Sequence, residues 1–139
     1  MQLGTFEGTE YAFSPNAGAG AARFIFEVAC PSTYRLFGRV LDDDAGVHGC
    51  CDPDSFDVEG PDNLEFPWFY GCDTVAAGWT WAQVETGELG GTCDDPVGVT
   101  VSLSAGLHAF TLRNREPAFG SATAGVAELV LTNDINYTP

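Results

Sequence analysis

The chain has 139 residues and a net charge of −15 at pH 7, and 45% of its residues are hydrophobic. This length suits one domain with a real core, and the apolar content excludes a disordered chain despite the acidity. The 17 Gly and 8 Pro predict many turns between short elements. The apolar runs are too short for a transmembrane helix. We therefore expect a single globular domain over residues 1–139.

The basic residues are few, and the acidic ones are concentrated. The 5 basic side chains are all Arg, and the sequence between Arg39 and Arg113 holds fourteen carboxylates and no cation. This charge repels phosphate groups, which excludes nucleic acid and anionic membranes from the expected partners. Divalent cations and neutral ligands such as glycans are compatible with it. Charge that serves only solubility is the alternative for most of these acids.

The N-terminus and the cysteines both bear on the cellular location of the chain. Met1–Gly4 shows neither the basic nor the apolar region of a signal peptide, as expected of a piece of a larger secreted chain. Five cysteines in turn-rich sequence predict two disulfides and one free thiol in an oxidising compartment. We favour Cys72–Cys93, which would staple the loop region that carries Trp79 and Trp81. A metal site at His48, Cys50 and Cys51, with nearby Asp52 and Asp54, is the alternative.

Apolar residues alternate with period two through most of the chain, which predicts strands rather than helices. In the segment 34–40, alternation places Leu36 on one face with Gly38 and Val40, and Phe37 on the other between two arginines. Ser104–Leu107 is a tight connection that suits a hairpin. The predicted strands are Arg23–Val28, Tyr34–Val40, Ser55–Glu59, Trp79–Val84, Val97–Leu103, His108–Arg113 and Val126–Thr132.

This pattern predicts an all-β fold, a β-sandwich (jelly roll) of eight to nine antiparallel strands with disulfide-stapled loops. The long connections are Leu41–Asp54 and Phe69–Ala77. Loops of a sandwich gather at its ends and carry functional residues. We therefore expect a binding site at one loop end.

The sequence offers little for catalysis. It has 2 His, and His108 lies inside a predicted strand, where a structural, half-buried imidazole is expected. No serine-hydrolase elbow, zinc-protease motif or phosphate-binding Gly loop occurs. A pair of carboxylates suited to glycoside hydrolysis is expected by chance among 20 acids. We therefore expect no enzymatic activity.

Aromatic residues give the strongest binding signal. Trp79 and Trp81 flank Thr80 in a predicted strand. We expect one indole to enter the core and the other to lie near the surface. Sugar rings present an apolar C–H face, which suits an exposed indole beside polar groups. The alternative is that both indoles serve packing.

Four stretches resemble the family 6 and family 35 carbohydrate-binding modules and their jelly-roll relatives. The resemblance covers residues 7–139, with five departures. Trp79 and Trp81 are closer together than in the family, Glu128 replaces an Asp, and the acidic opening strand is present only as Glu7–Glu10. The turn before Tyr34 lacks its Gly, and the acidic insert around residues 42–54 has no counterpart in the family. The stretches are Arg23–Val28 with Thr33–Leu36, Gly78–Trp81, Val101–His108 and Glu128–Asp134.

The resemblance implies a non-catalytic module that binds an oligo- or polysaccharide. Such a module is secreted or displayed at the cell surface, and it is covalently linked to neighbouring domains of a multimodular protein. Its ligand would stack on Trp79 in a cleft at the loop end. The other ligand-contacting residues implied there are Phe13, Asn16, Phe119, Ser121 and Thr123.

The resemblance also implies a structural Ca²⁺, held by Glu7, Glu10 and Glu128. Calcium prefers six to eight oxygen ligands, and the early and last strands of a jelly roll often share a sheet. Alternation places Glu128 on the face of Val126 and Val130, pointing inward, where a carboxylate needs a cation. Arg23 or Arg113 is the alternative partner for it.

Two other functions remain open on the same fold. A structural or adhesion domain that binds protein is favoured if both indoles are buried. A catalytic glycosidase or lyase domain is favoured if two carboxylates face each other across a cleft. An exposed Trp beside an open groove favours the glycan-binding module.

Overall fold

The fold was determined as a computed structural model that describes residues 1–42, 55–70, 78–86, 97–115 and 124–139. These residues form strands almost throughout, with one short 3₁₀ helix, η1 (Pro61–Asn63). They include no helix long and apolar enough to cross a membrane. The strands are β1 (Gln2–Phe6), β2 (Thr9–Phe13), β3 (Ala22–Val28), β4 (Ser32–Asp42), β5 (Ser55–Glu59), β6 (Glu65–Phe69), β7 (Gly78–Gln83), β8 (Glu85–Thr86), β9 (Val97–Gly98), β10 (Thr100–Leu103), β11 (Gly106–Asn114) and β12 (Gly125–Thr132).

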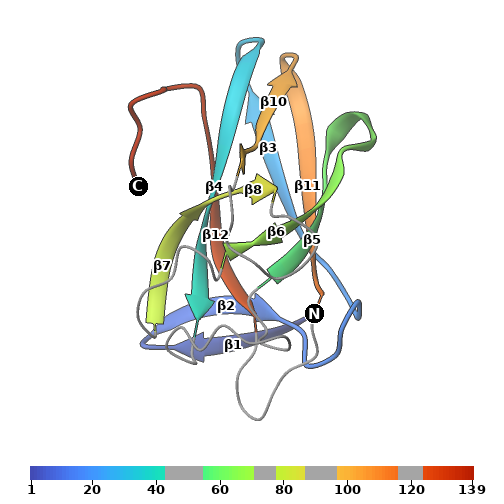
Figure 1. The fold of residues 1–139 in the computed structure, drawn as a ribbon, viewed down its shortest axis with the longest axis vertical. Helices are drawn as coiled ribbons and strands as arrows, with labels where there is room; N and C mark the ends of the chain where they lie inside the picture. Colours follow the sequence, from blue (N-terminus) through green and yellow to red (C-terminus); the bar gives the residue numbers. More distant parts are fainter. Residues whose placement is uncertain (43–54, 71–77, 87–96, 116–123) are drawn as a thin grey trace.

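The strands build a β-sandwich of two antiparallel sheets (Figure 1). Sheet A has the order β1-β2-β12-β4-β10, and β7 pairs with the far half of β4. Sheet B has the order β3-β11-β5-β6, and β8 and β9 form a separate ribbon. The chain changes sheet six times, between β2 and β3, β3 and β4, β4 and β5, β6 and β7, β10 and β11, and β11 and β12. The expected all-β sandwich of antiparallel strands is confirmed, with β1, β8, β9 and β10 as short additions to eight main strands.

The sequence pattern does not predict strand β6 or the β1–β2 hairpin. β6 contains Pro67, which argues against a central strand, but β6 lies at the edge of sheet B, where a missing N–H is tolerated. The pattern also gives no hairpin at β1–β2, because it favours a single opening strand at Glu7–Glu10. Glu7 and Gly8 instead form the turn, with positive φ of 50° and 81°, as a tight two-residue hairpin requires.

The hairpin expected at Ser104–Leu107 is wrong. β10 pairs with β4 in sheet A, whereas β11 pairs with β3 and β5 in sheet B. The connection is therefore a corner between the two layers, opened by Gly106 with φ 130°. The corner lets Leu103 before it and Phe110 after it both point into the space between the sheets, where both side chains are buried.

The core fills the space between the two sheets, as the alternation of segment 34–40 predicts. Leu36 and Val40 are buried in it, and Trp68 of β6 is fully buried opposite them. The Trp68 Nε1–H donates to the Gln83 carbonyl at 3.0 Å, which links sheet B to sheet A. A methyl group on Gly38 would overlap the Trp68 ring, so Gly38 makes room for the largest core side chain.

Candidate functional site

The outer face of sheet A carries a group of aromatic side chains, which we call the aromatic cluster: Phe6, Tyr11, Phe13 and Trp79. In the strand register, Phe13 of β2 lies opposite Gly125 of β12, and Gly125 lies opposite Leu41 of β4. Leu41 lies opposite Trp79 of β7, so these four residues run across sheet A in one line. Leu41 is only 1% exposed although it lies on the outer face of sheet A and is not part of the core between the sheets. The cluster is therefore a second apolar centre outside the sandwich.

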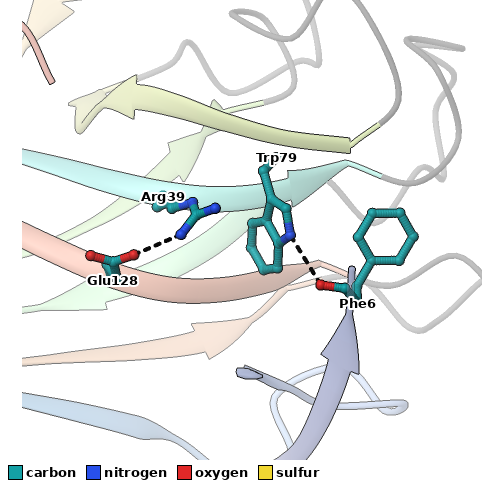
Figure 2. Close-up of polar contacts among 4 residues, drawn as sticks. All are labelled: Phe6, Arg39, Trp79 and Glu128. Carbon is teal, nitrogen blue, oxygen red and sulfur yellow. Dashed lines mark hydrogen bonds and ion pairs between the residues drawn. The ribbon is translucent and has the colours of Figure 1, made fainter. Parts of the chain in front are cut away.

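Trp79 is held on this face by contacts from the β1–β2 hairpin. Its Nε1–H donates to the Phe6 carbonyl at 3.3 Å (Figure 2). The rings of Phe6 and Tyr11 meet it edge to face, with centroids at 6.3 and 5.7 Å. Edge-to-face pairs of this kind contribute about 0.5–1.5 kcal/mol beyond burial. The indole is thus half-buried and fixed in orientation.

Two glycines set the position of Tyr11. A Cβ on Gly4 of β1 would lie 2.7 Å from the Tyr11 ring, and one on Gly125 of β12 would lie 2.6 Å from it. The ring therefore rests directly on the backbone of two strands, where any side chain would displace it. This close approach lets Tyr11 reach Trp79 across the sheet.

Arg39 joins the aromatic cluster to an ion pair. Its guanidinium carbon lies 5.2 Å from the Trp79 ring centroid, and its Nη1 donates to Glu128 Oε1 at 2.9 Å (Figure 2). The two side chains are 30% and 51% exposed. Carboxylate and guanidinium groups at the rim of an indole provide acceptors and donors for the hydroxyls of a ligand.

The expectation that Trp79 and Trp81 divide between core and surface is wrong. Residues two apart in a strand share a face, and both indoles lie on the outer face of sheet A. Trp81 pairs with Arg39 in the register, one row from Trp79, and both indoles are half-buried. The backbone positions of the two Trp residues are thus about 7 Å apart along one strand, beside the Arg39–Glu128 pair.

The inward orientation predicted for Glu128 is also wrong. The register of β12 against β4 shifts between Val126 and Glu128, so that one extra residue interrupts the alternation. Val126 is buried in the core, whereas Glu128 turns outward to Arg39. The cation beside it is therefore Arg39, and not Arg23 or Arg113.

The other two proposed calcium ligands lie in the β1–β2 hairpin, where Glu7 forms the turn and Glu10 is exposed. The shared sheet expected for early and last strands exists, because β2 pairs with β12. No group of three or more His, Cys, Asp or Glu side chains suited to a metal forms within the described residues. Glu128 is paired with Arg39, and calcium binding by Glu7, Glu10 and Glu128 stays a prediction.

The remaining expected ligand contacts have mixed outcomes. Phe13 belongs to the aromatic cluster, with its ring 5.5 Å from that of Tyr11. Asn16 lies in an exposed turn, where its N–H donates to Ser14 Oγ at 3.3 Å, and it does not join the cluster. Phe119, Ser121 and Thr123 lie outside the described residues.

The cysteine predictions fall mostly outside the described residues, including Cys72–Cys93 and the alternative at His48, Cys50 and Cys51. Cys30 is described, and it is an exposed free thiol. This assignment leaves four cysteines, which can form two bridges in three ways. His108 is half-buried, with Nε2 2.8 Å from the Ser104 carbonyl, as expected for a structural imidazole.

The structure also shows a cavity that the sequence pattern did not indicate. It has a volume of about 460 Å³ and lies between the η1–β6 segment and β10, lined by residues 61–65 and 100–103. Asp62 and Asn63 there have positive φ of 59° and 61°, a backbone conformation uncommon for residues other than glycine. The sequence signal was the Gly60–Asn63 turn cluster, which predicts a turn but no cavity. β10 pairs with the opposite end of β4 from β7, so the cavity is separate from the aromatic cluster.

Comparison with known proteins adds no assignment. No protein-family model matches the chain. No curated protein is significantly similar to it.

Proposed function

We propose that this chain is a non-catalytic glycan-binding module that takes an oligo- or polysaccharide on the outer face of sheet A. The observation that carries the proposal is the pair of half-exposed indoles, Trp79 and Trp81, beside Arg39 and Glu128. Indoles offer flat apolar area to the C–H face of a sugar, and the ion pair offers hydrogen bonds to its hydroxyls.

The orientation of Trp79 supports this use of the face. Contacts with Phe6, Tyr11 and Arg39 hold the indole in place before any ligand arrives. A fixed aromatic side chain loses little conformational entropy on binding, which favours affinity. The proposed site therefore lies on the sheet face, and not only at the loop end that the family resemblance implies.

The charge distribution supports a neutral ligand. The net charge of −15 disfavours anionic partners, so nucleic acid and anionic membranes stay excluded from the proposal. We infer a secreted or cell-surface location, with the module covalently linked to neighbouring domains. Such linkage raises the effective concentration of a partner domain near polysaccharide.

The test is a glycan array followed by titration of the best ligand into the wild type and two variants. Trp79→Ala and Trp81→Ala should each raise Kd about tenfold or more, since loss of one stacked ring costs about 1–3 kcal/mol by analogy with stacked bases. Val97→Ala, at an exposed residue of the separate β8–β9 ribbon, is the matched control and should leave Kd unchanged. Adding EDTA tests the calcium prediction in the same experiment.

The outcomes distinguish the outer face of sheet A from the cavity as the glycan-binding site. If both Trp variants fold and retain full affinity, the outer face of sheet A is not the site. If Glu65→Gln in the cavity then abolishes binding, the cavity is the site. Absence of binding across the whole array contradicts the glycan function.

A structural or adhesion domain is the second candidate, because three residues of the chain itself already contact the Trp79 ring. On this alternative the aromatic cluster serves only to attach the β1–β2 hairpin to sheet A. It predicts that Trp79→Ala lowers the melting temperature while the array stays negative.

A further inference from the structure

Strand β3 forms one edge of sheet B in the part of the chain that the structure describes. β3 ends the strand order of that sheet, and its backbone partners in the described part of the chain are all in β11. The opposite edge strand, β6, contains Pro67, which lacks an N–H and discourages further pairing. β3 has seven residues and no proline. It is therefore the edge of sheet B that can accept another strand.

The sequence of β3 is complementary to itself when read in opposite directions from Ile25. An antiparallel copy centred there places Arg23 opposite Glu27, and Phe24 opposite Phe26. Ile25 faces its own counterpart, and Ala22 faces Val28. Directly opposite residues on one face are the pairs that stabilise antiparallel strands, both as opposite charges and as apolar contacts.

Arg23 is the arginine that has no ion-pair or hydrogen-bond partner among the described residues. Arg39, Arg113 and Arg115 each form an ion pair with a carboxylate. Arg35 donates to the carbonyls of Asp134 and Tyr137. Arg23 is exposed and has no such contact within the described residues, and the same holds for Glu27. They cannot pair within β3, because four residues of strand separate them by about 13 Å.

The surface around this edge also includes large exposed apolar side chains. Ile25 is 63% exposed, and Leu107, which pairs with Glu27 in the neighbouring strand, is 74% exposed. Phe24 and Phe26 are half-buried at the rim of the core. A strand added here would cover apolar surface as well as satisfy the free backbone groups.

We propose that the chain forms a symmetric homodimer in which β3 pairs antiparallel with β3 of a second copy, centred on Ile25. The twofold axis makes each contact occur twice, so two Arg23–Glu27 pairs flank one Ile25–Ile25 contact. The two copies of sheet B then form one continuous eight-stranded sheet. Because both copies carry a net charge of −15, the dimer is expected to be weak and to need physiological salt, which screens long-range repulsion.

Sedimentation equilibrium of the whole chain, from micromolar to millimolar concentration, tests the proposal. We expect a reversible monomer–dimer equilibrium. Arg23→Glu or Glu27→Arg alone places like charges opposite each other twice, and each should weaken association about tenfold. The double variant R23E/E27R restores opposite charges across the axis and should recover the wild-type constant. Ile25→Lys should abolish the dimer.

Leu3→Lys in β1 is the matched control, since Leu3 is 76% exposed on an edge strand of sheet A. It should leave the dimer intact, and melting temperatures establish that all variants are folded. A monomer at every concentration overturns the proposal. So does a folded double variant that fails to recover the dimer, or a dimer that Leu3→Lys removes and Ile25→Lys does not.

Discussion

The two ends of the outer face of sheet A use the same chemistry for different purposes. At one end Arg35 lies over Phe37, and the C-terminal residues 133–139 cover that ring through Tyr137, leaving Phe37 7% exposed. At the other end Arg39 lies over Trp79, and both Trp79 and Trp81 stay half-exposed. We call these the covered end and the open end.

The difference between the ends shows why an aromatic residue on an outward face does not by itself indicate a binding site. Arg35 donates to backbone carbonyls of the C-terminal segment at 2.6 and 3.5 Å, so its charge holds the cover in place. Arg39 instead pairs with the exposed Glu128 side chain. A ligand can reach the second arrangement but not the first.

Replacing the ring at each end gives the largest expected contrast in stability. Phe37→Ala should lower the free energy of unfolding by about 3 kcal/mol, because it removes a nearly buried ring. Trp79→Ala should cost about 1–2 kcal/mol, since part of the indole already remains in contact with water. Chemical denaturation of both variants measures the two values. Equal losses would contradict the distinction between a covered and an open end.

A substitution at Gly38 tests the packing of the core beneath the outer face of sheet A. A methyl group there would overlap the Trp68 ring, so Gly38→Ala should cost about 2 kcal/mol through overpacking of the core. Gly125→Ala is the matched comparison, because its methyl group would meet the Tyr11 ring on the half-exposed outer face. Tyr11 can move away more easily than Trp68, so Gly125→Ala should cost less. The reverse order in urea denaturation would show that Tyr11 is the more rigid ring.

Arg35→Ala should convert the covered end into an open one. Losing two hydrogen bonds and the contact with Phe37 should cost about 1 kcal/mol and release the C-terminal segment. Amide exchange at Asn136 and Tyr137 should become faster, with β12 unchanged. Unaltered exchange in the variant would show that the Tyr137–Phe37 contact alone holds the cover.

The smallest effect is expected on sheet B, at the ion pair between Arg113 Nε and Glu59 Oε1, 2.9 Å apart. The hydrogen bond and charge of Glu59 raise the pKa of Arg113 above its ordinary value. A pKa raised on folding adds stability below the ordinary value and loses it only as pH rises through the raised one. Both values lie far above neutral pH, so this contribution should be constant from pH 6 to about 9.

Glu59→Gln should therefore change the melting temperature only slightly, because both side chains are well exposed to solvent. The small change should vanish in high salt. Thermal melts at low and high ionic strength give the comparison. A large loss that persists in salt would assign this pair a packing role.

The sequence pattern predicts the main strands well where alternation is uninterrupted. Leu36, Phe37 and Val40 lie on the faces that alternation assigns to them. It fails where one residue changes the pattern. Pro67 conceals β6, and the register shift before Glu128 turns that carboxylate outward. A hydrophobic pattern carries no signal for an extra residue of this kind.

The candidate site was only partly predictable, since its neighbours come from distant parts of the chain. Trp79 can be recognised from its residue type, but the residues that hold it, Phe6 and Tyr11, come from a hairpin that the sequence pattern did not predict. Glu128 is 89 residues from Arg39 in the chain. No local spacing reports a pair at that separation.

The position of β12 inside sheet A has a consequence for folding kinetics. β12 lies between β2 and β4, and it joins Ala12 to Val126 and Phe37 to Val130. Until residues 125–132 are in place, β2 and β4 have unpaired sides, and closing such long loops makes folding slow. During synthesis these sides stay available to other nascent chains until the last strand has emerged. We expect refolding yield to fall with protein concentration, and most steeply for variants that weaken β12.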